Sequence, residues 1–264
     1  MCTFSRSVKV VSDTSIFARS VEGRQFLVYG MTYAAGSELA MVLPLPVPPN
    51  SPEEAIRFIN LEGYRTLFND MRKGFPPILM RSYSLIPSLS LNVPKLRVHD
   101  VGSFEASFVP QLRDFDRLDE RFRISRDVWD QLPDYRDYGF AVFKLKRSRS
   151  LWFWDLPRRV HPMAFEFPQR NPNRLYFPTV HVHDQTLHPD ARFDHALYYQ
   201  SPQPIHDMRD GWHRSGKPAS EFVDASRTCG IVASDEYCWR LVLRGRRENK
   251  DCWVGMDGSV PRAA

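Results

Sequence analysis

Half of the histidines in this chain gather in one short segment. Four of the eight lie within FPTVHVHDQTLHPDARFDHALYYQ, residues 177–200, at positions His181, His183, His188 and His195. Neutral imidazole is a ligand for zinc, copper and iron, and a site with three imidazoles leaves a coordination position for water or substrate. The segment therefore predicts a site for one transition-metal ion.

The period of a β-strand places two of these histidines together. Side chains alternate between faces along a strand, so His181 and His183 point the same way, roughly 7 Å apart. If residues 188–190 form a three-residue hairpin loop, His195 lies opposite His183 and three imidazoles converge. With a two-residue loop the register moves by one, and His195 turns to the other face. The predicted metal ligands are His181, His183 and His195.

Neighbouring side chains are expected to complete the site. Asp194 and Asp184 are close enough in sequence to accept a ring N–H or to act as a carboxylate ligand. His188, in the expected turn, is the weakest ligand candidate of the four. Neighbouring segments are expected to bring His161, His206 and His213 near the site. The aromatic residues expected to line it are Phe193 or Tyr199.

The amino terminus carries a second chemical candidate. Removal of Met1 exposes Cys2 with a free α-amine, whose pKa near 8 lets it act as a general base for the thiol. Met-Cys-Thr, followed by a strand and a hairpin containing Arg19, resembles the opening of amino-terminal-nucleophile hydrolases such as the bile-salt and penicillin-amide hydrolases. The resemblance implies that Cys2 is a nucleophile, and it ends at Arg19.

The composition bounds the class of protein. With 42% hydrophobic residues in 264, the chain has material for a core without disulfides, and its four cysteines form no CxxC pair. Its longest uncharged run, LAMVLPLPVPPNSP, is interrupted by prolines, and the start has no apolar signal region. We therefore expect a cytoplasmic protein without a membrane partner.

The charge gives no sign of a nucleic-acid partner. The formal net charge is only +5, and no nucleic-acid motif accompanies the basic run RLVLRGRRENK, residues 240–250. That run is expected to be a solvated strand edge. No Gly-rich phosphate loop, GxSxG or HExxH motif is present, which disfavours the familiar nucleotide-dependent and hydrolytic chemistries.

The pattern of the chain predicts an α+β fold, a predominantly antiparallel sheet with a few short helices packed on one face. Glu22-Gly23 marks a hairpin turn, and Ser51 with Glu54 forms a capping box for a helix that buries Ile56 and Ile59. We expect residues 1–264 to form a single domain. It subdivides into residues 1–100, strands plus helices, and residues 101–264, a β-rich half with the histidines.

Three segments resemble an uncharacterised bacterial family, a domain of unknown function. They are MVLPLPVP, similar to its Pro-rich VPVP-like strand, YGFAVFKL, and HPMAFEFP, similar to its YPLR-like strand. The resemblance spans residues 26–200 in outline and supports the expected fold. No activity is implied by it.

These observations predict a metal-dependent enzyme that uses iron, copper or zinc for oxidation or hydrolysis of a small-molecule or peptide substrate. Asp194 is the expected catalytic partner of the metal. Two alternatives stay open: a non-enzymatic β-rich binding or scaffold protein with incidental histidines, and the hydrolase with Cys2 as nucleophile.

Overall fold

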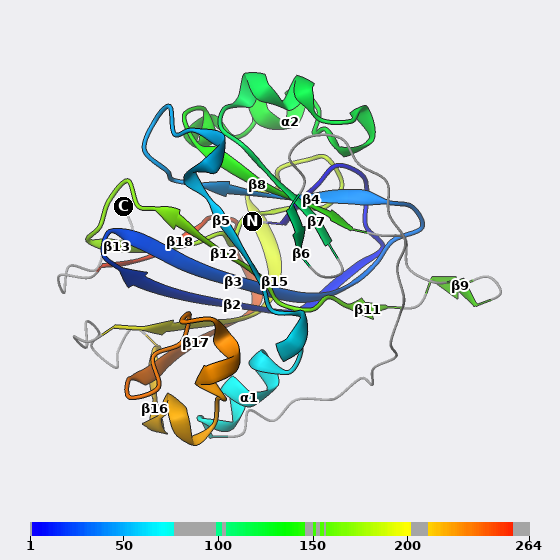
Figure 1. The fold of residues 1–264 in the computed structure, drawn as a ribbon. Helices are drawn as coiled ribbons and strands as arrows, with labels where there is room; N and C mark the ends of the chain where they lie inside the picture. Colours follow the sequence, from blue (N-terminus) through cyan, green and yellow to red (C-terminus); the bar gives the residue numbers. More distant parts are fainter. Residues whose placement is uncertain are drawn as a thin grey trace.

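Two β-sheets pack face to face, and short helical segments cover both outer faces (Figure 1). The computed structural model describes residues 2–76, 99–101, 104–145, 150–151, 154–155, 157–201 and 211–255, with no side-chain description for Cys2, 99–101 and 150–155. The prediction of a strand-rich α+β chain with few short helices is confirmed. The prediction that the helices lie on one face is wrong, since they form layers on both sides.

The first sheet has six strands, and its order brings distant segments together. In spatial order they are β14 (His181–Val182), β1 (Cys2–Phe4), β4 (Leu39–Leu45), β8 (Gly139–Leu145), β7 (Phe104–Val109) and β6 (His99–Val101). The pair β1/β14 is parallel and the other pairs are antiparallel. The amino-terminal strand thus lies beside the first histidine.

The second sheet contains the longest strands. In order they are β16 (His213–Pro218), β17 (Tyr237–Glu248), β15 (Asp190–Gln200), β2 (Val10–Val21), β3 (Arg24–Ala34), β12 (Met163–Pro168) and β5 (Arg57–Asn60), with β11 (Arg158–Arg159) also paired to β3. The pair β15/β2 is parallel, so both sheets are mixed. Two small ribbons pair β13 (Arg174–Phe177) with β18 (Cys252–Gly255) and β9 (Ser150–Leu151) with β10 (Trp154–Asp155).

The helical elements are short. They are α1 (Leu67–Lys73), α2 (Arg126–Asp130) and 3-10 turns at Glu53–Ala55, Glu62–Tyr64, Leu112–Arg117, Glu120–Phe122, Pro133–Tyr135, Ala219–Glu221 and Ala225–Thr228. The segment around α2 covers the six-stranded sheet, and α1 with residues 219–228 covers the eight-stranded sheet (Figure 1). Within the described residues, no helix is long and apolar enough to cross a membrane.

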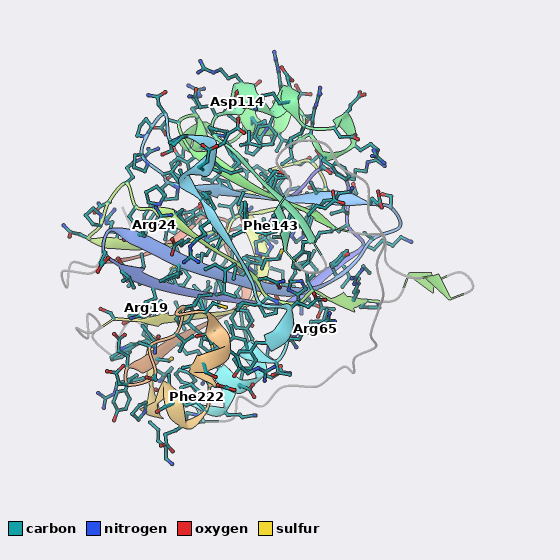
Figure 2. All side chains as sticks on the ribbon, in the orientation of Figure 1. Arg19, Arg24, Arg65, Asp114, Phe143 and Phe222 are labelled. Atoms are coloured by element: carbon teal, nitrogen blue, oxygen red, sulfur yellow. The ribbon has the colours of Figure 1, made fainter. Side chains whose placement is uncertain are left out.

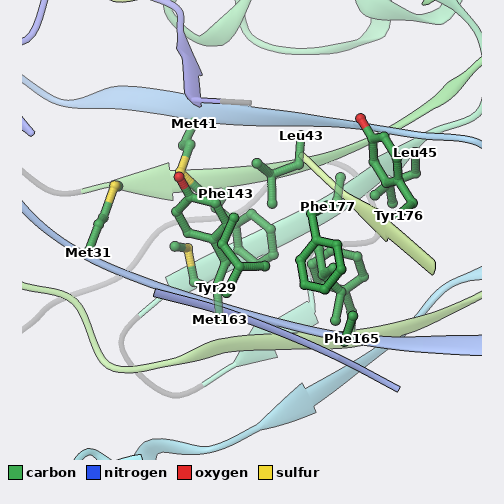
Figure 3. Close-up of a cluster of buried hydrophobic side chains, with 14 of the residues drawn as sticks. Tyr29, Met31, Met41, Leu43, Leu45, Phe143, Met163, Phe165, Tyr176 and Phe177 are labelled. Carbon is green, nitrogen blue, oxygen red and sulfur yellow. The ribbon is translucent and has the colours of Figure 1, made fainter. Parts of the chain in front are cut away.

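Three buried clusters follow from these four layers. The largest fills the space between the sheets, where Met41 and Leu43 of β4 meet Tyr29 of β3, with Phe143 and Phe165 among them (Figure 3). The other two lie between each sheet and its helical cover. Strands β3 and β4 are buried on both faces, which explains why their sequences read as nearly continuous apolar runs.

The side chains follow the same division (Figure 2). Phe143 points into the interior, Asp114 lies on the helical layer over one sheet, and Phe222 lies in the layer over the other. Close approach of α1 requires a glycine, because a Cβ on Gly30 would stand 2.8 Å from the ring of Phe68.

The hairpin predicted at Glu22-Gly23 is confirmed. Val21 pairs with Arg24, and the two turn residues have φ values of 49° and 74°. Positive φ at both central positions is the geometry of the two-residue turn that matches strand twist.

The helix predicted after Ser51 is wrong. Residues 53–55 form one 3-10 turn, and Arg57–Asn60 is strand β5, paired with β12. The Ser51 hydroxyl donates to the carbonyl of Pro48 at 2.7 Å instead of capping a helix. Ile56 and Ile59 are both buried as expected, but in different clusters, which is the alternation of a strand.

One carboxylate joins three parts of the fold. Asp251 Oδ1 accepts the backbone N–H of Thr179 at 2.8 Å and of Val180 at 3.0 Å. Its Oδ2 accepts the hydroxyl groups of Tyr135 at 2.6 Å and Tyr176 at 2.7 Å. The helical layer, β13 and the approach to β14 are therefore fixed to one side chain.

Replacing Asp251 by Asn is expected to destabilise the fold by about 3 kcal/mol, because an NH2 group would face donors that have lost their acceptor. Asp190→Asn is the control, since that exposed carboxylate forms a long ion pair with Arg246 at 3.6 Å, and it should change the unfolding free energy by about 0.5 kcal/mol or less. Urea denaturation measures both. Equal unfolding free energies for the two variants would contradict the role of Asp251.

Candidate functional site

Three histidine rings meet where β14, the edge strand of the six-stranded sheet, approaches β15, an interior strand of the eight-stranded sheet. His181 Nε2 lies 3.2 Å from His195 Nε2, and the centroids of these rings are 4.8 Å apart. The ring of His183 lies 5.0 Å from that of His181. His195 is buried, with 1% of its surface exposed, whereas His181 and His183 are half-buried. The cluster therefore has a buried floor and an accessible rim.

The hairpin that was expected to bring these rings together is absent, and that prediction is wrong. β14 pairs with β1 in the six-stranded sheet, with His181 opposite Cys2, while β15 belongs to the eight-stranded sheet. The strand partner of His195 is Leu243, and Asp190, expected in the loop, already belongs to β15. The rings meet between two sheets, so strand-pairing rules could not have predicted their contact.

The side chain of Asn249 holds β14 on its open edge. Its Oδ1 accepts the backbone N–H of His181 at 2.7 Å, and its Nδ2 donates to the carbonyl of the same residue at 2.9 Å. The same Nδ2 donates to the carbonyl of His188 at 2.9 Å. Asn249 thus mimics a neighbouring strand and fixes the backbone that carries His181.

Aromatic rings enclose the cluster. Phe193 lies 4.6 Å from the ring of His181 and 5.2 Å from that of His195, and Phe4 lies 5.6 Å from the ring of His183. Tyr199, the other expected lining residue, packs against two tryptophans at 4.9 and 6.1 Å. Water is therefore excluded from the inner side of the histidines.

Asp194 lies behind His195. Its Oδ1 is 3.6 Å from His195 Nδ1, longer than a direct hydrogen bond, and its Oδ2 accepts the backbone N–H of Asp13 at 2.7 Å. Asp13 has a φ of 53° at a bulge in β2, which turns its N–H toward β15. Partial burial opposes the effect, but the contacts with His195 and the Asp13 N–H lower the pKa of Asp194. The carboxylate is ionised and aimed at the imidazole.

Three buried polar atoms in this region have no hydrogen-bond partner among the residues that the structure describes: His183 Nε2, His195 Nδ1 and Thr14 Oγ1. Thr14 belongs here because Ser15 pairs with Ala196, which makes the preceding residues Thr14 and His195 neighbours. Buried polar groups are rarely left without partners. Nitrogen and oxygen atoms of this kind are groups that can bind a ligand.

Burial keeps the imidazoles neutral. Desolvation is the main cause that lowers the pKa of His183 to about 4, and the nearby His195 adds to it. Burial also lowers the pKa of His181 strongly, followed by the effect of the two other histidines. The pKa of His195 is lowered by burial despite the opposing effect of Asp194. Neutral imidazole is the form that binds metal.

Other predicted contributors lie elsewhere. Asp184 accepts from His188 Nε2 at 2.9 Å at the exposed surface, away from the ring pair. His161 is buried against Phe104, with ring centroids 4.0 Å apart, and His213 is exposed in β16. His206 and Met1, like the side chain of Cys2, fall outside the described part of the chain.

Among the described residues, no group of three or more His, Cys, Asp or Glu side chains is placed so that it could hold a metal ion. Sequence reasoning missed Asn249, Thr14 and Asp13, the residues that position the histidines. Asn249 and Asp251 flank Lys250 at the end of a basic run, and nothing in their sequence context indicates which strand they hold.

Comparison with known proteins shows no family. No family model matches the chain. A stretch of 62 residues, 24% of this chain, is 34% identical to the nonribosomal peptide synthetase sidE of Aspergillus fumigatus, of which it spans only 3%. The crystal structure of baculovirus P35 aligns with 94% of this chain and 96% of its own, at 15% identity and a TM-score of 0.45.

A pH dependence of stability follows from the buried imidazoles. Folding lowers the pKa of His183 from 6.5 to about 4. Between these two pH values, the histidine therefore binds more protons in the unfolded protein than in the folded protein. Its contribution to stability is full above pH 6.5 and is lost as the pH falls toward 4. In chelator-treated protein, the urea midpoint should therefore fall less steeply over this range for His183→Gln than for the wild type.

His188→Gln is the matched control, because this exposed histidine of the same loop contacts only Asp184 and the Asn249 amide. It should follow the wild-type pH curve. Identical slopes for all three proteins would contradict a buried, neutral His183.

Proposed function

We propose that His181, His183 and His195 bind one transition-metal ion and that this ion serves a metal-dependent enzyme. The observation that carries the proposal is the 3.2 Å separation of His181 Nε2 and His195 Nε2. Two nitrogen ligands about 2.0–2.1 Å from a tetrahedral metal stand about 3.3–3.4 Å apart. The two ring nitrogens are already spaced as neighbouring ligands.

Two of the three ring separations fit the same arithmetic. Imidazole rings bound through Nε2 to one tetrahedral metal have centroids roughly 5 Å apart, since each centroid lies just behind its nitrogen. The separations of 4.8 and 5.0 Å from His181 agree with that value. His183 Nε2, buried and without a partner among the described residues, is the donor that completes the set by turning toward the pair.

The surroundings support a catalytic site over a closed structural one. Three histidines leave a coordination position, and the half-buried rim of His181 and His183 gives a small molecule or a peptide access to it. Asp194 Oδ1 stands 3.6 Å from His195 Nδ1, and by shortening this contact it would orient the imidazole and make it a better metal ligand. A metal bound here supplies Lewis-acid or redox chemistry. Three imidazole ligands would suit zinc, copper or iron, and with them hydrolysis or oxidation.

The alternative is a non-enzymatic scaffold protein. A separation of 3.2 Å also fits a direct N–H···N hydrogen bond between two neutral imidazoles. That interaction leaves His183 Nε2 without a role, which is why we favour the metal.

Metal analysis of protein purified without an affinity tag tests the proposal. We expect close to one zinc, copper or iron per chain, and at least a tenfold weaker affinity in His183→Gln, measured by chelator competition. His188→Gln should bind like the wild type. Absence of stoichiometric metal from the wild type after incubation with each ion, or equal affinity in both variants, would contradict the proposal and favour the scaffold protein.

A second candidate function rests on the strand pairing of Cys2. Cys2 lies opposite His181 in the parallel β1/β14 pair, so the amino-terminal strand runs beside the histidine cluster. In the hydrolase alternative, Cys2 is the nucleophile. Arg19, the other residue of that resemblance, instead donates to the carbonyl groups of Gly230 and Ile231, at 3.2 and 3.4 Å.

The hydrolase alternative predicts an intact mass without Met1 and faster alkylation of Cys2 than of exposed Cys229 at neutral pH. Buried Cys238, with a pKa raised to about 12 by burial, is the internal control and should not react in the folded protein. Retained Met1, or alkylation of Cys2 no faster than of Cys229, would count against this alternative.

A further inference from the structure

Arginines gather on the outer face of the eight-stranded sheet, beside α1 and away from the histidines. The expected solvated edge at residues 240–250 is exposed from Arg244 to Glu248, but Arg240 is buried, with 6% of its surface exposed. A buried guanidinium normally pairs with a carboxylate. The role expected for this run, a solvated strand edge, therefore does not explain why Arg240 is buried.

The contacts of Arg240 are incomplete. Its guanidinium stands 4.5 Å above the ring of Phe75, and one NH2 group donates weakly to the carbonyl of Pro76 at 3.4 Å. Among the described residues, its buried Nε has no hydrogen-bond partner, and no carboxylate forms an ion pair with the guanidinium. The positive charge is held in place but not neutralised.

Further positive groups surround it. Tyr198 is the strand partner of Arg240, and the charges of Arg72 and Arg240 oppose the rise in its pKa that burial causes. Arg72 and Arg159 share one carboxylate, that of Asp13, and Arg159 stands 3.0 Å from it. Two of these guanidinium groups thus share one carboxylate, and Arg240 has no ion pair with any described carboxylate, so the three exceed their acidic partner by two positive charges.

We infer that this cluster binds a phosphate group, with Arg240, Arg72 and the Tyr198 hydroxyl as its ligands. A phosphate carries about −1.5 to −2 charges at neutral pH, which matches the excess, whereas a carboxylate neutralises half of it. Guanidinium groups donate paired hydrogen bonds to phosphate oxygens. The side chains of Arg72 and Arg159 are 31% and 19% exposed and form the entrance from solvent.

The ligand is a free phosphate ion or a small phosphate monoester. Calorimetric titration at constant ionic strength with inorganic phosphate and with glycerol 3-phosphate distinguishes the two. Low millimolar concentrations avoid the general stabilisation that phosphate salts give to proteins. We expect saturable binding of at least one of these probes to the wild type. The probe that binds with the higher affinity shows whether the ligand is the free ion or a monoester.

Arg240→Gln should weaken binding about 10- to 100-fold, since it removes charge-assisted hydrogen bonds. Arg246→Gln is the matched control, because this arginine of the same strand is 81% exposed and pairs with Asp190, and it should bind like the wild type. Arg72→Gln, on the accessible side, should also weaken binding and provides the test if Arg240→Gln does not fold. Absence of saturable binding to the wild type, or equal binding in Arg72→Gln and Arg246→Gln, would overturn the inference.

Discussion

The carboxylate of Asp251 is the interaction on which the arrangement of the histidines depends. It lies between β17 and β18, and it holds both the helical layer, through Tyr135, and the backbone just before β14. Asn249, two residues earlier, holds β14 itself. One short turn thus fixes the edge of the six-stranded sheet against the eight-stranded sheet, and His181 meets His195 across that junction.

The chemistry of the junction follows from its place in the fold. The sheets pack face to face and helical layers cover their outer faces, so the central strands are apolar on both sides, and polar groups collect where this packing ends. The histidines lie at such an edge, with Phe193 and Phe4 on the inner side. Burial makes them neutral and leaves donors without partners. A metal bound by the three Nε2 atoms would satisfy one of these atoms, His183 Nε2.

Local patterns were predictable from the sequence. The Glu22-Gly23 turn and the strand YGFAVFKL depend on nearby residues, and both occur. The segment after Ser51 was not predictable, because Ile56 and Ile59 fit a helical face as well as the two faces of a strand. Pairing with β12 and burial of the two isoleucines in separate clusters stabilise the strand instead of a helix.

The histidines of the candidate site were predictable from the sequence, but the way in which the fold brings them together was not. His181 and His183 share a face because of strand alternation, and the density of histidines marked the segment. The contact with His195 comes from packing between sheets, and Asn249 and Asp251 act on residues about 70 positions earlier in the chain. Such long-range contacts leave no periodic signal in one sequence.

A crystal structure of the zinc-loaded protein, with anomalous scattering measured at the zinc edge, tests the central claim most directly. The account predicts one strong peak about 2.0–2.2 Å from Nε2 of His181, His183 and His195, with a water or an anion in the remaining position. A peak only at the exposed His188–Asp184 pair, or direct bonding of His181 to His195 with no metal between them, would contradict it.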